Sequence, residues 1–296
     1  MVPDSKDPLL EALSVKIVHD DNPVRFLNLA EPLFEKEEAQ YNLIWSIASS
    51  LAEGRRLDPK PPVFIRIEHD RKTIACALQA SPHGLLLTTA TQSEVNLMVT
   101  SLRERKIDVI SAIGPALTVQ HFADSWVTLT GKKARILMKQ RMYQLTKVTF
   151  PQSPGGQMVQ AESVHIPQVE EWMEAFAREA VPNDPDSFLR FRQAAGSRIL
   201  SGDFFLWDTG KDFVSAACLS GATKRGVRIS MVFTPPSCRN KGYASALVAH
   251  LAHYILQSGK DFCVLYTDEL NPTSNGIYQK IGFKPIGDSI YYRFDG

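Results

Sequence analysis

The chain has 296 residues, a length that favours two hydrophobic cores over one. Its composition, 44% hydrophobic and 22% charged, is that of a globular protein and excludes disordered and fibrous classes. Lysine and arginine total 33 against 32 acidic residues, a net charge of +1, which gives no electrostatic basis for binding nucleic acid or a membrane surface. Small molecules are therefore the expected partners.

Cysteine usage and the N-terminal residues indicate the compartment. The four cysteines form no Cys-x-x-Cys pair, so neither a zinc site nor a disulfide framework is predicted; they are Cys76, Cys218, Cys238 and Cys263. The chain begins with MVPDSKDPLLEALSVK, whose acidic residues and prolines do not suit a secretory signal peptide. No run approaches the roughly 18 apolar residues of a membrane span. We expect a cytoplasmic protein that binds no metal and no membrane.

The first half predicts a mixed α/β unit. Apolar residues at helical spacing indicate a helix over 30–52 that ends at Gly54. Three β-rich runs then suggest an antiparallel meander, with turns at Asp70-Arg71-Lys72 and Ser81-Pro82-His83-Gly84; the runs are 63–68, 73–80 and 85–90. Two helices and two strands complete the unit: helix 93–105, strand 109–112, helix 116–128 and strand 139–148.

Two prolines and two adjacent glycines mark a linker at Phe150-Pro-Gln-Ser-Pro-Gly-Gly156. They predict one domain over residues 1–150 and a second over 156–296. The second domain alternates strands and helices in an α+β order. Its strands are expected at 158–161, 199–208, 213–220, 227–233, 262–266 and 289–294, and its helices at 166–177, 185–195, 241–257 and 274–281.

The most informative segment is the strand 227–233, which leads through a short loop into a helix. The loop ends in Arg239-Asn240-Lys241-Gly242-Tyr243-Ala244. Amide groups at a helix N-terminus are unpaired and can donate to phosphate oxygens. Gly242 would let a ligand approach the backbone, and Arg239 and Lys241 would add positive charge. Taken alone, the loop is equally well explained as an ordinary strand–helix connection.

A second motif follows the strand 262–266 and reads Asn271-Pro-Thr-Ser-Asn-Gly-Ile-Tyr-Gln-Lys-Ile-Gly-Phe283. Ser274 is suited to cap its short helix, and Gly282 to end it. Tyr278 lies one helical turn beyond Ser274, on the same face. An isolated tyrosine more often simply packs, so its role depends on the paired motifs.

The two motifs, in this order, resemble the signatures of GNAT acyltransferases, Arg/Gln-x-x-Gly-x-Gly/Ala and Asn-x-x-(Ser/Ala)-x-x-x-Tyr-x-x-x-Gly-Phe. The resemblance covers residues 156–296 and implies an α+β GNAT fold with a mixed, centrally splayed sheet. Strands 227–233 and 262–266 would run parallel and then separate to hold the pantetheine arm of acetyl-CoA. The resemblance implies that acetyl-CoA contacts the backbone of Met231, Val232 and Phe233, the loop Arg239, Asn240, Lys241, Gly242, Tyr243 and Ala244, and Asn271 and Ser274.

The implied chemistry is acetyl transfer from acetyl-CoA to a primary amine by direct attack. The amine must first lose a proton, the backbone N–H of Val232 would stabilise the oxyanion, and Tyr278 would protonate the departing thiolate. Many relatives carry a glutamate base on the strand before the loop, whereas this chain has Arg228-Ile-Ser-Met-Val-Phe233. Ser230 would only orient a water. The other candidate bases, for each of which a solvated surface carboxylate is the commoner explanation, are Asp268, Glu269, Glu170, Glu174 and Glu179.

The acceptor and the first half leave alternatives open. Trp172, Met173 and Phe176 would line an apolar acceptor pocket or form a core stripe. The first half looks similar to the opening of another GNAT fold. However, nothing in 85–123 matches the loop 239–244 that the resemblance assigns to pyrophosphate binding, and Pro115 lacks an N–H. We expect a degenerate GNAT-like domain that shapes the acceptor cleft or mediates a homodimer.

Two rival functions stay open. One is a non-catalytic acetyl-CoA sensor. The other is a transferase that uses a longer acyl-CoA or an aminoacyl-tRNA, and the near-zero net charge disfavours the aminoacyl-tRNA.

Overall fold

The computed structural model describes residues 15–296 except 57, 82–83 and 183. The expectation about the N-terminal segment, and part of the predicted turn at Ser81–Gly84, lie outside the described residues. The chain divides into two compact units, one of Met1–Ile136 with Asp288–Gly296 and the other of Leu137–Gly287. The division differs from the predicted linker at 150–156, which lies inside the second unit.

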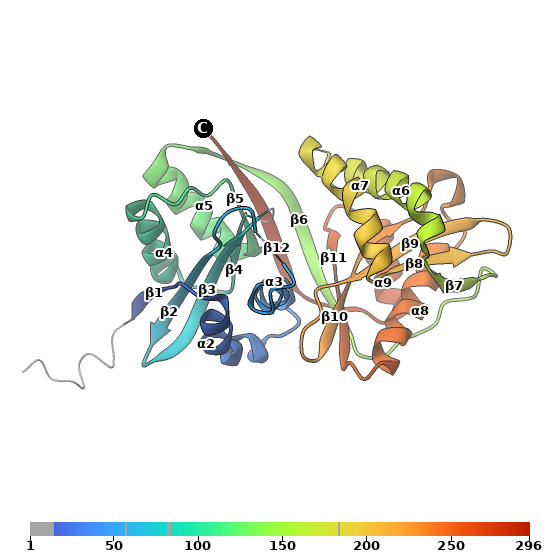
Figure 1. Ribbon diagram of the computed structural model, residues 1–296, viewed down its shortest axis with the longest axis horizontal. Coiled ribbons are helices and arrows are strands. Elements are labelled where there is room, and N and C mark those ends of the chain that lie inside the picture. The colour runs from blue at the N-terminus through green and yellow to red at the C-terminus, as the bar shows by residue number, and fades with distance from the viewer. Residues whose placement is uncertain (1–14, 57, 82–83, 183) are drawn as a thin grey trace, which may run out of the picture. The chain divides into compact units, whose positions relative to one another are not determined.

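The first unit is a sheet covered on both faces by helices (Figure 1). Its strands lie in the order β1 (Lys16–Asp20), β2 (Val63–His69), β3 (Lys72–Ala80), β4 (Gly84–Leu87), β5 (Ser111–Pro115) and β12 (Lys284–Asp295). Neighbours are antiparallel except for β4 and β5, which are parallel. The helices are α2 (Pro23–Lys36), α3 (Asn42–Ala52), α4 (Gln92–Glu104) and α5 (Ala116–Thr130).

Alternation along the strands gives the first unit two cores. Phe64 packs with α2 and α3, whereas the next residue, Ile65, packs with α4 and α5.

The prediction of one helix over 30–52 is wrong. Asn22 starts α2 early by accepting the N–H groups of Val24 and Arg25, and the chain leaves helical geometry at Glu37 before α3 begins.

The second unit contains six strands of mixed direction, in the order β6 (Lys133–Leu145), β11 (Phe262–Asp268), β10 (Gly226–Phe233), β9 (Phe213–Ser220), β8 (Phe204–Asp208) and β7 (Gln157–Gln160). Only β10 and β11 are parallel among these pairs. Its helices are α6 (Ile166–Ala180), α7 (Pro185–Leu200), α8 (Tyr243–Gln257) and α9 (Pro272–Ile281), with short 3-10 turns at Ser163–His165 and Pro236–Cys238. The expected strand over 199–208 starts only at Phe204, because α7 continues and buries Ile199 in the core one turn beyond Ala195.

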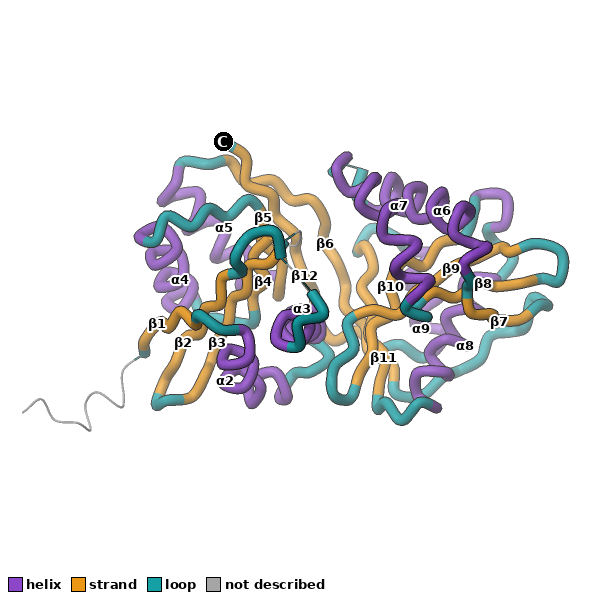
Figure 2. The backbone as a smooth tube through the Cα atoms, viewed as in Figure 1, coloured by secondary structure: helices purple, strands orange, loops and turns teal. Residues whose placement is uncertain are grey.

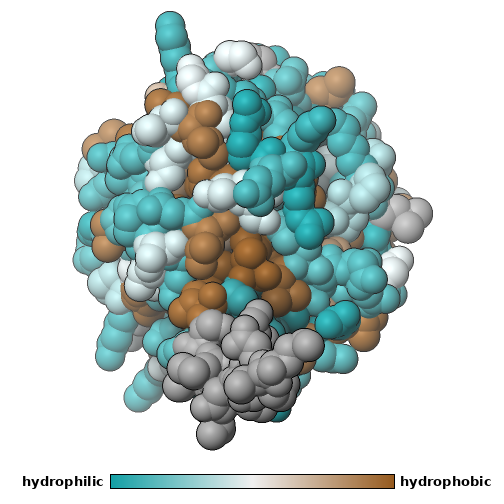
Figure 3. All heavy atoms as spheres, turned by 90° about the vertical axis from the view of Figure 1, so that its left-hand side faces the viewer, coloured by the Kyte–Doolittle hydropathy of each residue, from teal (hydrophilic) through white to brown (hydrophobic). Residues whose placement is uncertain are grey.

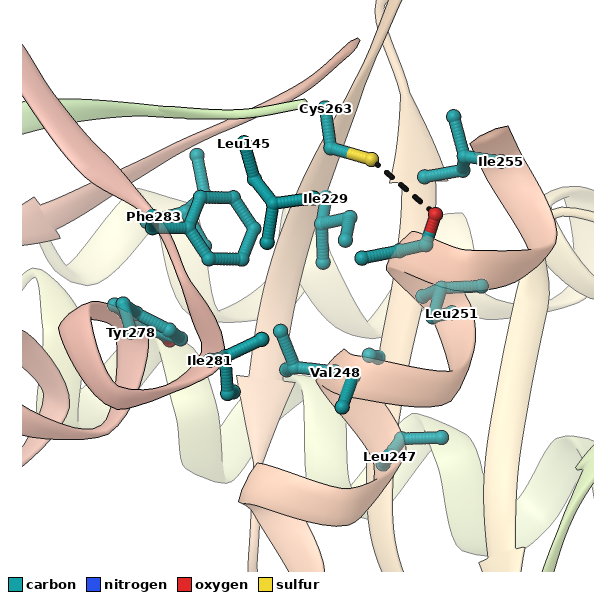
Figure 4. Close-up of a cluster of buried hydrophobic side chains, with 14 of the residues drawn as sticks. Leu145, Ile229, Leu247, Val248, Leu251, Ile255, Cys263, Tyr278, Ile281 and Phe283 are labelled. Atoms are coloured by element: carbon teal, nitrogen blue, oxygen red, sulfur yellow. Dashed lines mark hydrogen bonds between the residues drawn. The ribbon is translucent and has the colours of Figure 1, made fainter. Parts of the chain in front are cut away.

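The helices of the second unit lie on opposite faces of its sheet, as the purple and orange segments of Figure 2 show. The face of α6 and α7 buries Val169, Met173 and Ala195 against Cys218 and Met231 of the sheet. The face of α8 and α9 buries a larger set that includes Leu247, Leu251 and Tyr278, packed against Ile229 and Leu265 (Figure 4). Successive residues of β10 therefore point alternately to the two helical layers, which positions the candidate site.

The surface and the thiols add two findings. In the view of Figure 3, hydrophilic side chains cover most of the face and hydrophobic ones gather near its centre. Cys76, Cys218 and Cys263 are buried as free thiols, and Cys238 is partly exposed. Within the described part of the chain, no helix is long and apolar enough to cross a membrane, and no three His, Cys, Asp or Glu side chains gather as metal ligands would.

Candidate active site

The two parallel strands at the middle of the second sheet separate partway along their length. β10 pairs with β11 only from Gly226 to Arg228, opposite Phe262 to Val264. Beyond this point each strand stays paired with its outer neighbour only, β10 with β9 as far as Phe233 and β11 with β6 as far as Asp268. The inner edges that diverge carry backbone donors and acceptors without a strand partner, which is the arrangement that an extended ligand can join.

A β-bulge lies on the diverging part of β10. The pairing register with β9 shifts between Ser230 and Phe233, and Met231 has a φ of 52°, in the left-handed region. Backbone strain of this kind costs about 1–3 kcal/mol and concentrates at functional sites. The bulge buries Met231 in the α6/α7 core while Val232 packs toward α8, so it turns the backbone at Met231, Val232 and Phe233. The sequence contains no signal for this bulge.

The loop after β10 exposes the start of α8. Asn240 and Gly242 both have positive φ, 63° and 84°, and Gly242 is the N-cap residue of α8. No side chain caps this helix, and the first intrahelical bond runs from the N–H of Ala246 to the carbonyl of Gly242 at 3.0 Å. The amides of the first turn, including those of Tyr243 and Ala244, are thus oriented to bind an anion.

The corresponding helix of the first unit is closed to an anion. The N-cap residue of α4 is Thr91, whose side chain accepts the N–H of Glu94, and the carboxylate of Glu94 accepts the N–H of Thr91 at 2.7 Å. This capping box occupies the N–H groups of Glu94 and Thr91 and adds a negative charge at the helix start. A Cβ atom at Gly114 of β5 would lie 2.6 Å from the carbonyl oxygen of Leu87, the last residue of β4, so the two strands are still in contact there. The features of the second unit are not repeated there.

The two cations of the loop are held by other groups. Nη2 of Arg239 lies 2.7 and 2.9 Å from the carboxylate oxygens of Glu179 on α6, and its Nε donates to the carbonyl of Thr234 at 2.9 Å. Nζ of Lys241 donates to the carbonyl of Ser237 at 3.2 Å. Arg239 thus ties the loop before α8 to α6, and Lys241 closes the loop on itself.

The second motif forms α9, with a different cap from the one expected. The side chain of Asn271, not that of Ser274, caps the helix by accepting the N–H of Ser274 at 3.0 Å. Asparagine is as good a cap as serine and lies in position to accept from the third residue beyond it. Gly282 ends the helix with a φ of 112°, as expected. Asn275 accepts the hydroxyl of Tyr143 at 2.9 Å and so ties α9 to β6.

Tyr278 points into the core between α8, α9 and the sheet (Figure 4). Its side chain is 7% exposed, and its ring centre lies 5.9 Å from that of Phe283 and 6.4 Å from that of Tyr143. Burial raises the pKa of Tyr278 to about 12, against a smaller opposite effect of a hydrogen bond with Ser274. The phenol therefore keeps its proton throughout the neutral pH range, and the ring also contributes to packing.

The candidate carboxylate bases all have partners. Glu174 accepts from Arg178 and Arg192 at 2.7 and 3.0 Å, and these hydrogen bonds hold its pKa below the usual range. The other four are similarly engaged: Glu170 with Arg192, Glu179 with Arg239, Glu269 with Arg141, and Asp268 with the backbone N–H of Leu270. Ser230 lies 3.0 Å from Ser220 and 3.1 Å from Cys218, measured between their Oγ and Sγ atoms.

The predicted acceptor-pocket residues divide into two groups. Met173 is 3% exposed and belongs to the α6/α7 core. Trp172 and Phe176 are partly buried, with the ring of Trp172 centred 6.1 Å from that of Phe233 and the ring of Phe176 5.7 Å from that of Phe191. Trp172 therefore lies beside the end of β10, whereas Phe176 joins α6 to α7.

The order of elements, the splayed parallel pair, the bulge and the uncapped helix define the GNAT fold, and the expectation of this α+β fold is confirmed. Residues 213–292 match the family model of FR47-like proteins, a GNAT-related group, and this match includes β10, the loop before α8 and the second motif. A search of curated proteins found no match.

Several solved structures share the fold along nearly the whole chain. A Drosophila protein superposes with a TM-score of 0.64 at 10% identity, over 94% of this chain and 97% of that one. A GCN5-related N-acetyltransferase from Sphaerobacter thermophilus gives 0.57 at 13% identity, over 95% and 96%. A tandem GNAT protein of the clavulanic acid biosynthesis pathway gives 0.52 at 10% identity, over 94% and 98%. At such identities the likeness establishes the fold alone.

Proposed function

We propose that the second unit transfers an acetyl group from acetyl-CoA to a primary amine of a small molecule or protein. The observation that carries this proposal is the conjunction of an uncapped α8 with a bulged strand that separates from its parallel neighbour. The amides at the start of α8 would bind the pyrophosphate. The pantetheine arm would lie along Met231 to Phe233, with Asn271 and Ser274 at its other side. No metal is needed for this chemistry.

The reaction follows from the same elements. The neutral amine attacks the thioester carbon, and the N–H of Val232, turned by the bulge, stabilises the oxyanion. The carbon–sulfur bond then breaks, and Tyr278 donates its proton to the departing thiolate. Because the five carboxylates are engaged elsewhere, a water oriented by Ser230 takes the proton that the amine loses. A cytoplasmic location and a homodimer stay predictions.

Replacing Tyr278 with phenylalanine tests the acid. Phenylalanine keeps the ring in the core and removes only the hydroxyl, so we expect the fold and the affinity for acetyl-CoA to stay nearly unchanged. Turnover should fall by roughly a hundredfold, the lower end of the range for general acids, since a pKa of about 12 is far from the optimum. Steady-state kinetics with a free-thiol assay measure this. Unaltered turnover would remove Tyr278 from the mechanism.

The donor site and the transfer are tested in sequence. Calorimetric titration of acetyl-CoA should show micromolar binding, and incubation with a panel of amines should release free CoA together with an acetylated product identified by mass spectrometry. Binding without transfer to any amine would favour the sensor. Tighter binding and faster transfer with longer acyl-CoA would favour an alternative donor.

A further inference from the structure

An ion pair joins the last turn of α6 to the loop before α8. Nη2 of Arg239 lies 2.7 and 2.9 Å from the two carboxylate oxygens of Glu179, and the two side chains are 41% and 51% exposed. Nε of Arg239 donates to the carbonyl of Thr234, just beyond β10, and its guanidinium carbon lies 6.0 Å from the ring centre of Phe233. The guanidinium is therefore held against α6 and the end of β10.

Glu179 differs from two other carboxylates of α6 in where its partner lies. Glu170 and Glu174 pair with Arg192 of α7, and Glu174 pairs also with Arg178 of α6 itself. Glu179 pairs instead with the loop that leads into α8, the helix that no side chain caps. Its negative charge therefore acts on the segment to which the proposed function assigns the pyrophosphate.

This ion pair can be exchanged for a stronger one. Both side chains are solvated, and ion pairs at such positions contribute little, because water screens the charges and the long side chains lose freedom. The guanidinium fork matches phosphate oxygens through two parallel hydrogen bonds, and a diphosphate carries more negative charge than one carboxylate. Arg239 precedes Gly242, the N-cap residue of α8, by only three positions, so a diphosphate bound at the helix start would be close to it.

We propose that Glu179 competes with the diphosphate of acetyl-CoA for the guanidinium of Arg239, and so limits the affinity of the protein for its donor. The exchange replaces one ion pair with another and involves no covalent change. The same competition acts on CoA, the product, which carries the same diphosphate, so Glu179 favours its release after each turnover. This inference rests on the proposed acetyl transfer and assigns to Glu179 a role in donor affinity.

Calorimetric titration of the Glu179→Gln variant with acetyl-CoA and with CoA tests the competition. Glutamine keeps the size of the side chain and removes its charge, so Kd for both ligands should fall by about two- to fivefold, the scale of an exposed ion pair. Glu171→Gln removes the same charge from an exposed position on α6, about 12 Å earlier along the helix, and should bind as the wild type does. An unchanged or higher Kd in Glu179→Gln would overturn the inference.

A double-mutant cycle with Arg239→Gln separates competition for the guanidinium from general repulsion of the ligand. The motif admits glutamine at this position, so Arg239→Gln should still bind acetyl-CoA, with a higher Kd. Adding Glu179→Gln to this variant should then leave Kd unchanged, because no guanidinium is left to compete for. Equal tightening in both backgrounds would overturn the inference and leave the proposed function standing. No binding of acetyl-CoA by the wild type would remove the proposed function and the inference with it.

Discussion

Replacing Gly242 with glutamate is expected to abolish detectable binding of acetyl-CoA. The carboxylate would lie at the start of α8, where the amides are free to bind phosphate, and it would repel the pyrophosphate. At about 4 Å and an effective dielectric constant near 20, one such repulsion is worth about 4 kcal/mol, or about a thousandfold in Kd. A Cβ atom at Gly242 would meet only Cβ of Pro154, at 3.8 Å, so the effect does not require a clash.

Gly259 provides the control for this variant. It follows α8 at the opposite end, has a similar φ of 87°, and has no atom within 4 Å of its Cβ position. Gly259→Glu therefore introduces the same backbone strain, about 1–2 kcal/mol, but places its carboxylate away from the loop before α8. Calorimetric titration of both variants separates the two effects. Equal loss of affinity in both would attribute it to destabilisation, and retained affinity in Gly242→Glu would place acetyl-CoA elsewhere.

The second large effect is expected for a buried ion pair in the first unit. Arg66 is 1% exposed and donates to Asp20 through Nε at 2.5 Å and Nη2 at 3.0 Å, while Nη1 donates to Glu68 at 2.5 Å. Burial opposes the charge of Arg66, but its hydrogen bonds with Asp20 and Glu68 raise its pKa overall. Arg66→Met leaves the carboxylate of Asp20 buried with its closest partner removed. The free energy of unfolding should fall by about 3–5 kcal/mol.

Urea unfolding followed by tryptophan fluorescence measures this loss, because Trp45 and Trp126 are both buried in the first unit. Arg135→Gln is the control, since its ion pair with Asp295 is about half exposed and should contribute under about 1 kcal/mol. The double variant Arg66→Met, Asp20→Leu should regain at least half of the lost stability. A double variant as unstable as Arg66→Met would show that the arginine stem, and not the buried charge, is responsible.

Local patterns were sufficient to predict much of the second unit. The apolar stripe of α8 and the glycine that ends α9 depend on residues close together in the chain, and both were predictable. The continuation of α7 to Leu200 was not, because the β-rich appearance of the following residues obscured the helical spacing of Ala195 and Ile199. The early start of α2 depends on the cap at Asn22, which stands outside the periodic stretch, and the break before α3 begins at Glu37.

The residues of the candidate site likewise fall into those that local motifs predict and those that depend on long-range contacts. Gly242 and Tyr278 lie within motifs and were predictable from spacing, although their functional roles remain proposals. The bulge at Met231 depends on the pairing of β10 with β9. One partner of Glu174, Arg192, comes from α7, and the partner of Glu179, Arg239, comes from the loop before α8, although Arg178 pairs with Glu174 within α6. Contacts of this kind join residues distant in sequence, and no local pattern encodes them.

The division of the chain constrains the order in which the protein can be built. The last strand, β12, pairs with β5, so the sheet of the first unit includes the final residues of the chain. A nascent polypeptide that has emerged only as far as residue 150 lacks that strand, and Ile113 of β5 stays without its partner Tyr291 until β12 has been synthesised. The first unit therefore stays incomplete until residues 288–296 have been made, and a truncation at the linker removes a strand from each unit, β12 from the first and β6 from the second.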